Sequence, residues 1–195
     1  MSDNTSSALR RLTDAARQTH AEAPEDAAQM LCDGLALLPG EPGDLESFLG
    51  AAQHVMLGHL DDAAALREAL DRVQLFVEGR AGVATAVARG RLAIELVGNP
   101  HCASSLPAPE HIRALYDAAL ARSRRGEWPA VRERLATAIG FTEEGDPAAQ
   151  RAYASMANNI ADDIRFYLKP EQRRDAGRVD TMLDAARRAR EAWAK

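Results

Sequence analysis

Apolar residues recur three and four positions apart through most of the chain, which is the spacing of one face of an α-helix. Prolines, glycines and capping residues divide this pattern into nine segments. We predict helices over residues 6–20, 24–38, 44–57, 61–77, 83–97, 109–125, 129–141 and 147–168, and, after a break at Lys169-Pro170, a ninth that ends the chain. Because sustained alternation of apolar and polar residues is absent, no strand is predicted.

Turns of two to five residues join most of these segments, so neighbouring helices are expected to run antiparallel. The exception is the stretch 98–109, which contains three prolines and two adjacent serines. We expect one all-α domain over 1–195, with an irregular break at 98–109 that would separate helical halves 8–97 and 109–195. On the ninth helix the apolar stripe contains Leu183 and Trp193, together with Val179, Met182 and Ala186. This stripe is expected to face the core, with Trp193 sealing the terminal helix.

Two turns share a pattern at a spacing of 68 residues. One reads Gly58-His59-Leu60 and the other reads Gly126-Glu127-Trp128, and each leads into a helix that begins with a small or medium apolar residue. Glycine is expected to end the first helix in a left-handed conformation, and the large apolar side chain is expected to fill the gap between the two helices. The spacing is twice 34, so these helix pairs resemble the tetratricopeptide repeat (TPR).

The resemblance implies antiparallel helix pairs stacked as a right-handed α-α superhelix of about nine helices. The segment Asn158-Asn159-Ile160-Ala161 is similar to the Asn-Asn-Leu-Ala run in the first helix of many such repeats. By that resemblance the partner-binding residues on the concave face are Asn158, Asp162, Arg165 and Phe166, with Asn159 bonding the backbone of a bound peptide. The resemblance does not extend through residues 79–109.

The composition of the chain indicates what forms its core and which partners its charge disfavours. Hydrophobic residues make up 46% of the chain and aromatic residues only 5%, so the core must be built largely from alanine, leucine, valine and isoleucine. The net charge of −5 makes a nucleic-acid partner unlikely on charge grounds. Acidic residues interleave with the arginine clusters, which are therefore expected to be solvated, salt-bridged faces; they are Arg122-Arg124-Arg125, Arg132-Arg134, Arg173-Arg174 and Arg187-Arg188-Arg190.

The compartment is predicted to be the cytoplasm. No apolar run is long enough to span a membrane, and the first residues lack the apolar region of a signal peptide. The two cysteines, Cys32 and Cys102, are not arranged in a pair motif and are expected to be reduced, with Cys32 on the apolar side of its helix.

We identify no catalytic residue, no metal ligand set and no cofactor site. His54 and His59 are five residues apart and would not share a face of an α-helix, and no cysteine or carboxylate cluster accompanies them. His101 and Cys102 could act as a base and a thiol nucleophile, but side chains of sequence neighbours usually diverge, so a surface loop is the expected structure.

Three functions remain open. The first is a scaffold or adaptor that binds a segment of another protein through the asparagine amides, the charge of Arg165 and the ring of Phe166. The second is a structural protein that forms a homo-oligomer through its terminal helices. The third is a small-ligand-binding or enzymatic helical bundle, which requires a deep pocket with clustered polar groups.

Overall fold

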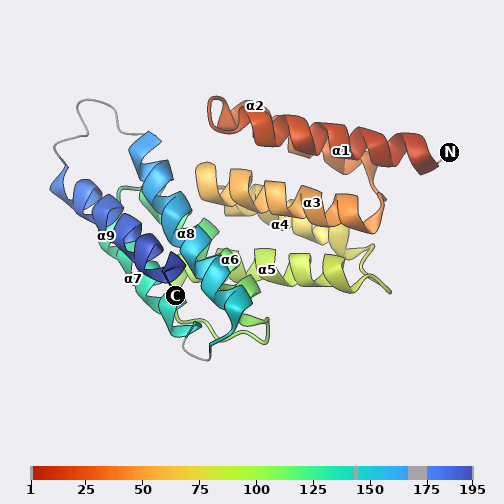
Figure 1. The fold of residues 1–195 in the computed structure, drawn as a ribbon. Helices are drawn as coiled ribbons and strands as arrows, with labels where there is room; N and C mark the ends of the chain where they lie inside the picture. The colour runs from red at the N-terminus through yellow and green to blue at the C-terminus, as the bar shows by residue number, and fades with distance from the viewer. Residues whose placement is uncertain (1, 143–144, 167–174, 195) are drawn as a thin grey trace. The chain divides into compact units, whose positions relative to one another are not determined.

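The structure of the protein is a computed structural model that describes residues 2–142, 145–166 and 175–194, with side chains from residue 8 onward. Nine α-helices and two short helices of other types account for its regular structure, and no strand occurs in these ranges (Figure 1). The α-helices are α1 (Ser2–Thr19), α2 (Pro24–Gly34), α3 (Pro42–Ala52), α4 (Ala63–Gln74), α5 (Ala81–Gly98), α6 (Ala108–Arg124), α7 (Trp128–Gly140), α8 (Pro147–Phe166) and α9 (Ala176–Trp193). A 3₁₀-helix, η1 (Leu35–Leu37), follows α2, and a π-helix, η2 (Gln53–His59), follows α3. The all-α prediction is therefore confirmed.

The chain divides into an N-terminal unit, residues 1–94, and a C-terminal unit, residues 95–195. The division falls inside α5, shortly before the predicted break at 98–109. That the chain forms a single domain stays a prediction. None of the helices in the described ranges is long and apolar enough to cross a lipid bilayer.

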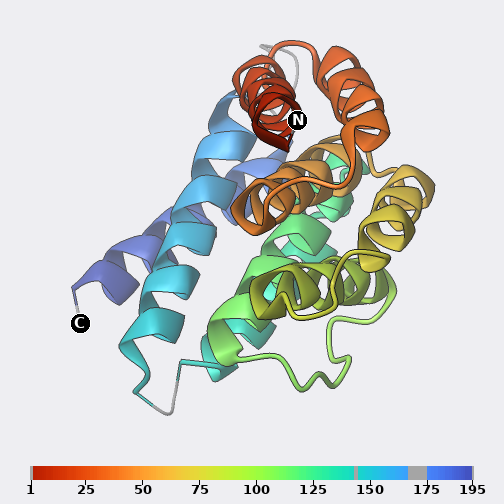
Figure 2. The same cartoon turned by 90° about the vertical axis from the view of Figure 1, so that its right-hand side faces the viewer.

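In the N-terminal unit, α1 pairs with α2 and also packs on α3 (Figure 2). Two arginines of α1 fix this arrangement. Arg10 binds the buried carboxylate of Asp44 at 2.7 Å, and Arg17 donates to the backbone carbonyl of Ser47 at 2.9 Å. The prediction that Cys32 lies on the apolar side of its helix is wrong, because Cys32 is exposed and the neighbouring positions Ala27 and Leu31 are buried instead.

The C-terminal unit contains two helix pairs. Helix α6 packs against α7 and α8, and α9 packs against α8 and α7, so the pair α6–α7 lies beside the pair α8–α9 (Figure 1). Many side chains buried between these helices are small, and alanines at positions 118, 119, 121, 154, 157, 161, 185 and 189 are covered. Small side chains let helices approach closely. This pairing of neighbouring helices is consistent with stacking.

The buried face of α9 differs from the predicted one. Leu183 and Trp193 are 57% and 59% exposed, so the prediction that their stripe faces the core is wrong. The buried positions are Arg178, Thr181, Ala185 and Ala189. Arg178 and Thr181 are polar but donate hydrogen bonds to the carbonyls of Ile164 and Gly177. These hydrogen bonds reduce the cost of burying the two polar residues, and the small alanines permit close contact with α8.

The arginines of α6 and α7 include a second departure from prediction. Arg134 is 1% exposed, although a solvated face was expected. Its guanidinium donates to the carbonyls of Leu96 and Val97, both at 2.6 Å, and Arg122 donates to the Val97 carbonyl at 2.7 Å. The last carbonyls of α5 have no partner inside their own helix, so these two arginines supply the missing donors and place positive charge at the negative helix end.

The two glycine turns also differ from each other. Gly126 has φ +71° and ends α6 as predicted. Gly58 lies inside η2 without a left-handed conformation, and Asp61 takes the positive φ of 55° instead. The prediction that Gly58 ends its helix is therefore wrong: the helix continues through it with π-type hydrogen bonds.

Candidate functional site

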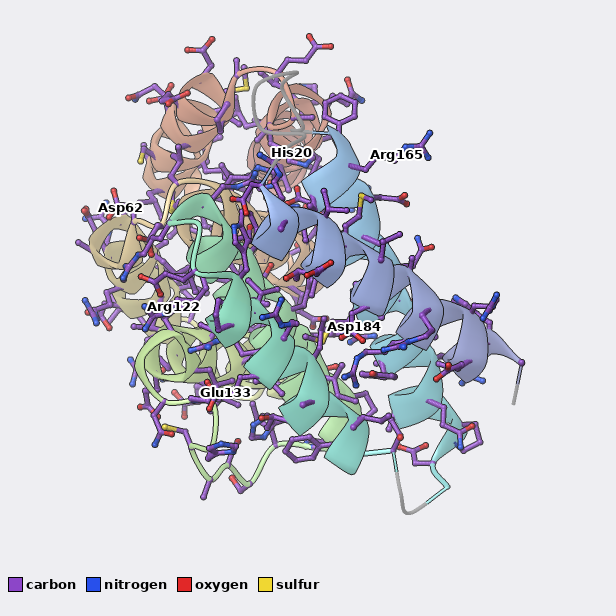
Figure 3. All side chains as sticks on the ribbon, turned by 90° about the vertical axis from the view of Figure 1, so that its left-hand side faces the viewer. His20, Asp62, Arg122, Glu133, Arg165 and Asp184 are labelled. Atoms are coloured by element: carbon purple, nitrogen blue, oxygen red, sulfur yellow. The ribbon has the colours of Figure 1, made fainter. Side chains whose placement is uncertain are left out.

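The five residues predicted to bind a partner all lie on the exposed side of α8. Asn158 donates from its amide to the Asp162 carboxylate at 3.2 Å, one turn further along the same helix. Arg165 points away from the helices (Figure 3), and Phe166 is 71% exposed at the helix end. Their role in binding stays a prediction.

Asn159 differs from the other four because it lines a groove between α6 and α8, which we call the α6/α8 groove. The groove has a volume of about 410 Å³. Its walls are formed by Pro109, Arg113 and Tyr116 from α6, and by Ala148, Arg151, Ala152, Ser155, Met156 and Asn159 from α8. Within each helix these residues are three or four positions apart, so one face of α6 and one face of α8 meet along the groove.

The groove has a polar centre in which Asn159 and Tyr116 share a side-chain hydrogen bond. Burial raises the pKa of Tyr116 far above its ordinary value, and the carboxylates of Asp117 and Asp163 raise it further. The phenol therefore stays protonated and can donate a hydrogen bond. An asparagine amide has two N–H donors and a carbonyl oxygen, so Asn159 can bond both Tyr116 and a peptide group in the groove.

Each wall of the groove carries an arginine. Arg113 forms an ion pair with Glu110 on the same helix, and Arg151 is exposed on the opposite wall. Behind the groove, Arg124 of α6 binds Asp163 of α8 at 2.9 Å, which holds the two helices together. The groove therefore combines two guanidinium groups with the Asn159–Tyr116 hydrogen bond.

Two further cavities occur in the C-terminal unit. One, of about 260 Å³, lies between α7, α8 and α9 and is lined by Tyr153, Arg187, Arg188 and Glu191, among others. Asp184, labelled in Figure 3, accepts hydrogen bonds from both of these arginines. Although burial raises the Asp184 pKa, the two arginines outweigh it and hold the pKa below its ordinary value.

The second cavity, of about 410 Å³, is lined by residues of the 98–109 stretch and by His111 and Phe141. His101 and Cys102 both border it, but His101 lies 3.7 Å from the Glu133 carboxylate. His111 is buried against Phe141, with ring centroids 4.3 Å apart, and burial lowers its pKa. The base-and-thiol arrangement considered for His101 and Cys102 gains no supporting contact from this geometry.

In the N-terminal unit, three histidines come together that the sequence pattern did not group. The Nε2 atoms of His54 and His59 are 3.2 Å apart. The centroid of the His20 ring lies 5.1 Å from that of His54 and 4.8 Å from that of His59. The expectation that His54 and His59 do not share a face is wrong, because η2 is a π-helix. In an α-helix, residues five apart point about 140° away from each other. In a π-helix the hydrogen bonds join residues five apart, so such residues lie above one another.

No family model matches the chain, and no curated protein or solved structure shows a significant match to it.

Proposed function

We propose that the C-terminal unit is a protein-interaction module that binds an extended acidic peptide segment in the α6/α8 groove. The observation that carries this proposal is the position of Asn159, which lines an open groove and is bonded there to Tyr116. An amide held in this way can bond the backbone of an extended chain without first losing side-chain freedom.

The acidic character of the partner follows from the charges. Arg113 and Arg151 line the groove from α6 and α8, and guanidinium groups pair with carboxylates through two parallel hydrogen bonds. Glu110, which is paired with Arg113, leaves the α6 side less positive than the α8 side. Arg151 is therefore the residue whose charge should matter most for binding.

The helix arrangement supports a TPR-like interpretation of this unit. In stacked helical hairpins, the first helices of successive pairs lie side by side and form one surface, and the second helices form the other. Helices α6 and α8 are neighbours in this sense, as are α7 and α9. We propose that α6–α7 and α8–α9 are two successive hairpins of such an array.

The test is a peptide array of ten-residue segments with acidic, neutral and basic sets, probed with the full chain and followed by titration of the best binders. We expect binders to come from the acidic set and Arg151→Glu to weaken them at least about tenfold, since one charge-assisted hydrogen bond contributes about 1.5–3 kcal/mol. If basic or neutral peptides bind equally well, the proposal is wrong.

Asn158 and Asn159 provide a matched pair of variants. Asn159→Ala removes the amide from the groove, whereas Asn158→Ala removes one that is paired with Asp162 outside it. We expect Asn159→Ala to weaken acidic peptides about tenfold and Asn158→Ala to leave them unchanged. Equal effects of both variants would place the binding surface elsewhere on α8.

A second function, self-association through α9, rests on the exposure of Leu183 and Trp193 at 57% and 59%. Large apolar side chains left in water favour contact with another apolar surface. Light scattering across a concentration series tests it: a dimer that becomes a monomer in a Leu183→Ser, Trp193→Ser variant would support self-association, and a monomeric unmodified chain would exclude it.

A further inference from the structure

His20, His54 and His59 form the only group of three or more potential metal ligands found among the described residues. We propose that this histidine cluster binds a single divalent transition-metal ion of the zinc, copper and nickel class through three imidazole nitrogens, and Zn²⁺ is the ion chosen for the test. The site lies in the N-terminal unit and is independent of the groove between α6 and α8.

The separations match what zinc requires. Zinc binds histidine nitrogens at about 2.0–2.1 Å in a tetrahedral arrangement, so two nitrogens on one ion are about 3.3 Å apart. The Nε2 atoms of His54 and His59 are already 3.2 Å apart. One ligand atom from each of the three histidines lies within 4.8 Å of the others, so His20 needs to approach by about 1.5 Å, which a side-chain rotation can provide.

The ring of His20 is oriented for this role. Its Nδ1 lies 2.6 Å from the backbone carbonyl of Arg17, and a carbonyl can only accept, so Nδ1 carries the proton. In a neutral imidazole the lone pair is then on Nε2. A hydrogen bond from one ring nitrogen to a backbone carbonyl is the usual way in which a metal-binding histidine is fixed in the correct tautomer.

The backbone around the cluster is fixed by contacts outside it. The turn after α1 keeps His20 in helical register, because its amide donates to the Ala16 carbonyl at 3.0 Å. Arg17, three residues earlier, anchors this end of α1 to the Ser47 carbonyl of α3, the helix that leads into η2. His20, labelled in Figure 3, therefore sits on a helix end that is tied to the element carrying the other two histidines.

The π-helix is a second observation that bears on the site. Single π turns are rare and occur frequently at functional sites, because they are less favourable than α-helical turns and persist where another interaction requires them. In η2 the amide of Leu60 bonds the Val55 carbonyl at 3.0 Å, five residues back. This winding is what brings His54 and His59 onto one face, so the irregular backbone and the ligand pair have one explanation.

The choice of metal follows from the ligands. Imidazole nitrogens suit zinc, copper and nickel, whereas magnesium and calcium prefer oxygen ligands. Three neutral imidazoles leave the double positive charge of the ion intact and a fourth tetrahedral position for solvent or an anion. His59 is 9% exposed, so the site is near the surface but largely covered.

The first experiment titrates the metal-free full chain with Zn²⁺ against a chromophoric chelator, and then with Co²⁺ as a spectroscopic substitute. We expect one ion per chain and, with Co²⁺, the visible absorption typical of tetrahedral nitrogen coordination. Mg²⁺ should not compete. Absence of stoichiometric Zn²⁺ binding would overturn the proposal and leave the histidines as a hydrogen-bonded packing cluster.

Variants separate the cluster from other histidines. We expect His20→Gln and His54→Gln each to weaken Zn²⁺ at least about a hundredfold, since loss of even an outer-shell partner typically costs 10–100-fold. His101→Gln is the matched control, because this side chain is 68% exposed and lies outside the cluster. It should bind as the unmodified chain does, and equal weakening in all three would overturn the site.

A thermal readout covers variants that fold poorly. An ion that binds only the folded chain raises its melting temperature, so Zn²⁺ should raise the Tm of the unmodified chain and of His101→Gln. The Tm of His20→Gln, a change at a helix end, should not respond. A Zn²⁺-induced increase in Tm that persists in His20→Gln would exclude this histidine as a ligand.

Discussion

The two turns that are 68 residues apart carry equivalent positions but differ in structure. In the first turn, His54 contacts His59, and in the second, Arg122 forms an ion pair with Glu127. Both pairs are five residues apart and occupy the same two positions of the pattern. The sequence pattern therefore places the same pair of positions in contact twice, with different chemistry each time.

The backbone reaches this result by two routes. In the first turn the helix widens into η2 and only Asp61 takes a left-handed conformation. In the second, α6 ends at Arg124 and Gly126 reverses the chain. The difference teaches that a glycine in a turn pattern does not determine where the helix ends. Hydrogen-bond register also depends on what the neighbouring helices require.

The largest expected effect comes from the position at which the turns differ most in chemistry. Arg134 is buried in α7, the helix after the second turn. The equivalent position in α4, the helix after the first turn, is the buried Leu66. We expect Arg134→Leu to lower the free energy of unfolding by about 3–5 kcal/mol, because it removes two charge-assisted hydrogen bonds, one to the Leu96 carbonyl and one to the Val97 carbonyl, and leaves Val97 with Arg122 alone. Urea unfolding followed by circular dichroism measures this.

Arg190→Leu is the control for that experiment, because Arg190 is exposed on α9 and its loss should change stability by less than about 0.5 kcal/mol. If Arg134→Leu changed the free energy of unfolding as little as this control, the arginine would not be needed to cap α5. The helices after the two turns would then both accept a leucine at this buried position.

The next largest effect concerns the large apolar residue of each turn. Trp128 packs against Gly177, donates to Asp175 at 3.0 Å and has the Arg178 guanidinium 5.7 Å from its ring centroid. We expect Trp128→Ala to cost about 2–3 kcal/mol, since packing and polar contacts are both lost. The equivalent Leu60→Ala, at a half-buried position, should cost only about 1 kcal/mol. Equal losses in urea unfolding would contradict this difference.

A smaller effect tests the turn backbone directly. Gly126 has φ +71°, where a Cβ is unfavourable, so Gly126→Ala should cost about 1–2 kcal/mol. Gly140, at the end of α7, has ordinary helical geometry and open space for a Cβ. Gly140→Ala should therefore stabilise by about 0.5 kcal/mol. Thermal melts give both values, and two shifts of the same sign would argue against left-handed strain at Gly126.

Most of the helices could be predicted from the sequence, because prolines and glycines mark their ends in the local pattern. The first turn of α8 begins at Pro147, and Gly126 ends α6. The buried face of α9 could not be predicted, because it depends on Arg178 and Thr181 finding carbonyl partners. Periodicity records which residues are apolar and not which polar residues are satisfied by a neighbour.

The candidate site also has one part that the sequence predicts and one part that depends on how the helices pack. Asn159 was predicted through a family resemblance, but Tyr116 and Arg151 belong to the groove only because α6 packs on α8. No local pattern contains that pairing. The histidine cluster could not be predicted from α-helical winding, which separates His54 from His59. The 68-residue spacing was the available signal, because it aligns His54 with Arg122 and His59 with Glu127.

The smallest expected effect is the pH dependence of stability that comes from the buried His111 of the C-terminal unit, as distinct from the clustered histidines of the N-terminal unit. No described residue provides a hydrogen-bond partner for Nε2 of His111, and burial lowers its pKa below the ordinary 6.5. As pH falls, the unfolded chain therefore takes up a proton at this residue before the folded chain does. The stability that neutral His111 contributes is complete above pH 6.5 and is lost as the pH falls from there toward the folded-state pKa.

We therefore expect the free energy of unfolding of the unmodified chain to decrease more between pH 7.5 and pH 5.5 than that of His111→Phe, which keeps a ring against Phe141. Urea unfolding with a chelator present measures both slopes. The histidine cluster is the same in the two chains, so it does not contribute to the difference. Parallel slopes would show that His111 is protonated as easily in the folded chain as in the unfolded one. The acid sensitivity of the protein would then originate outside this buried position.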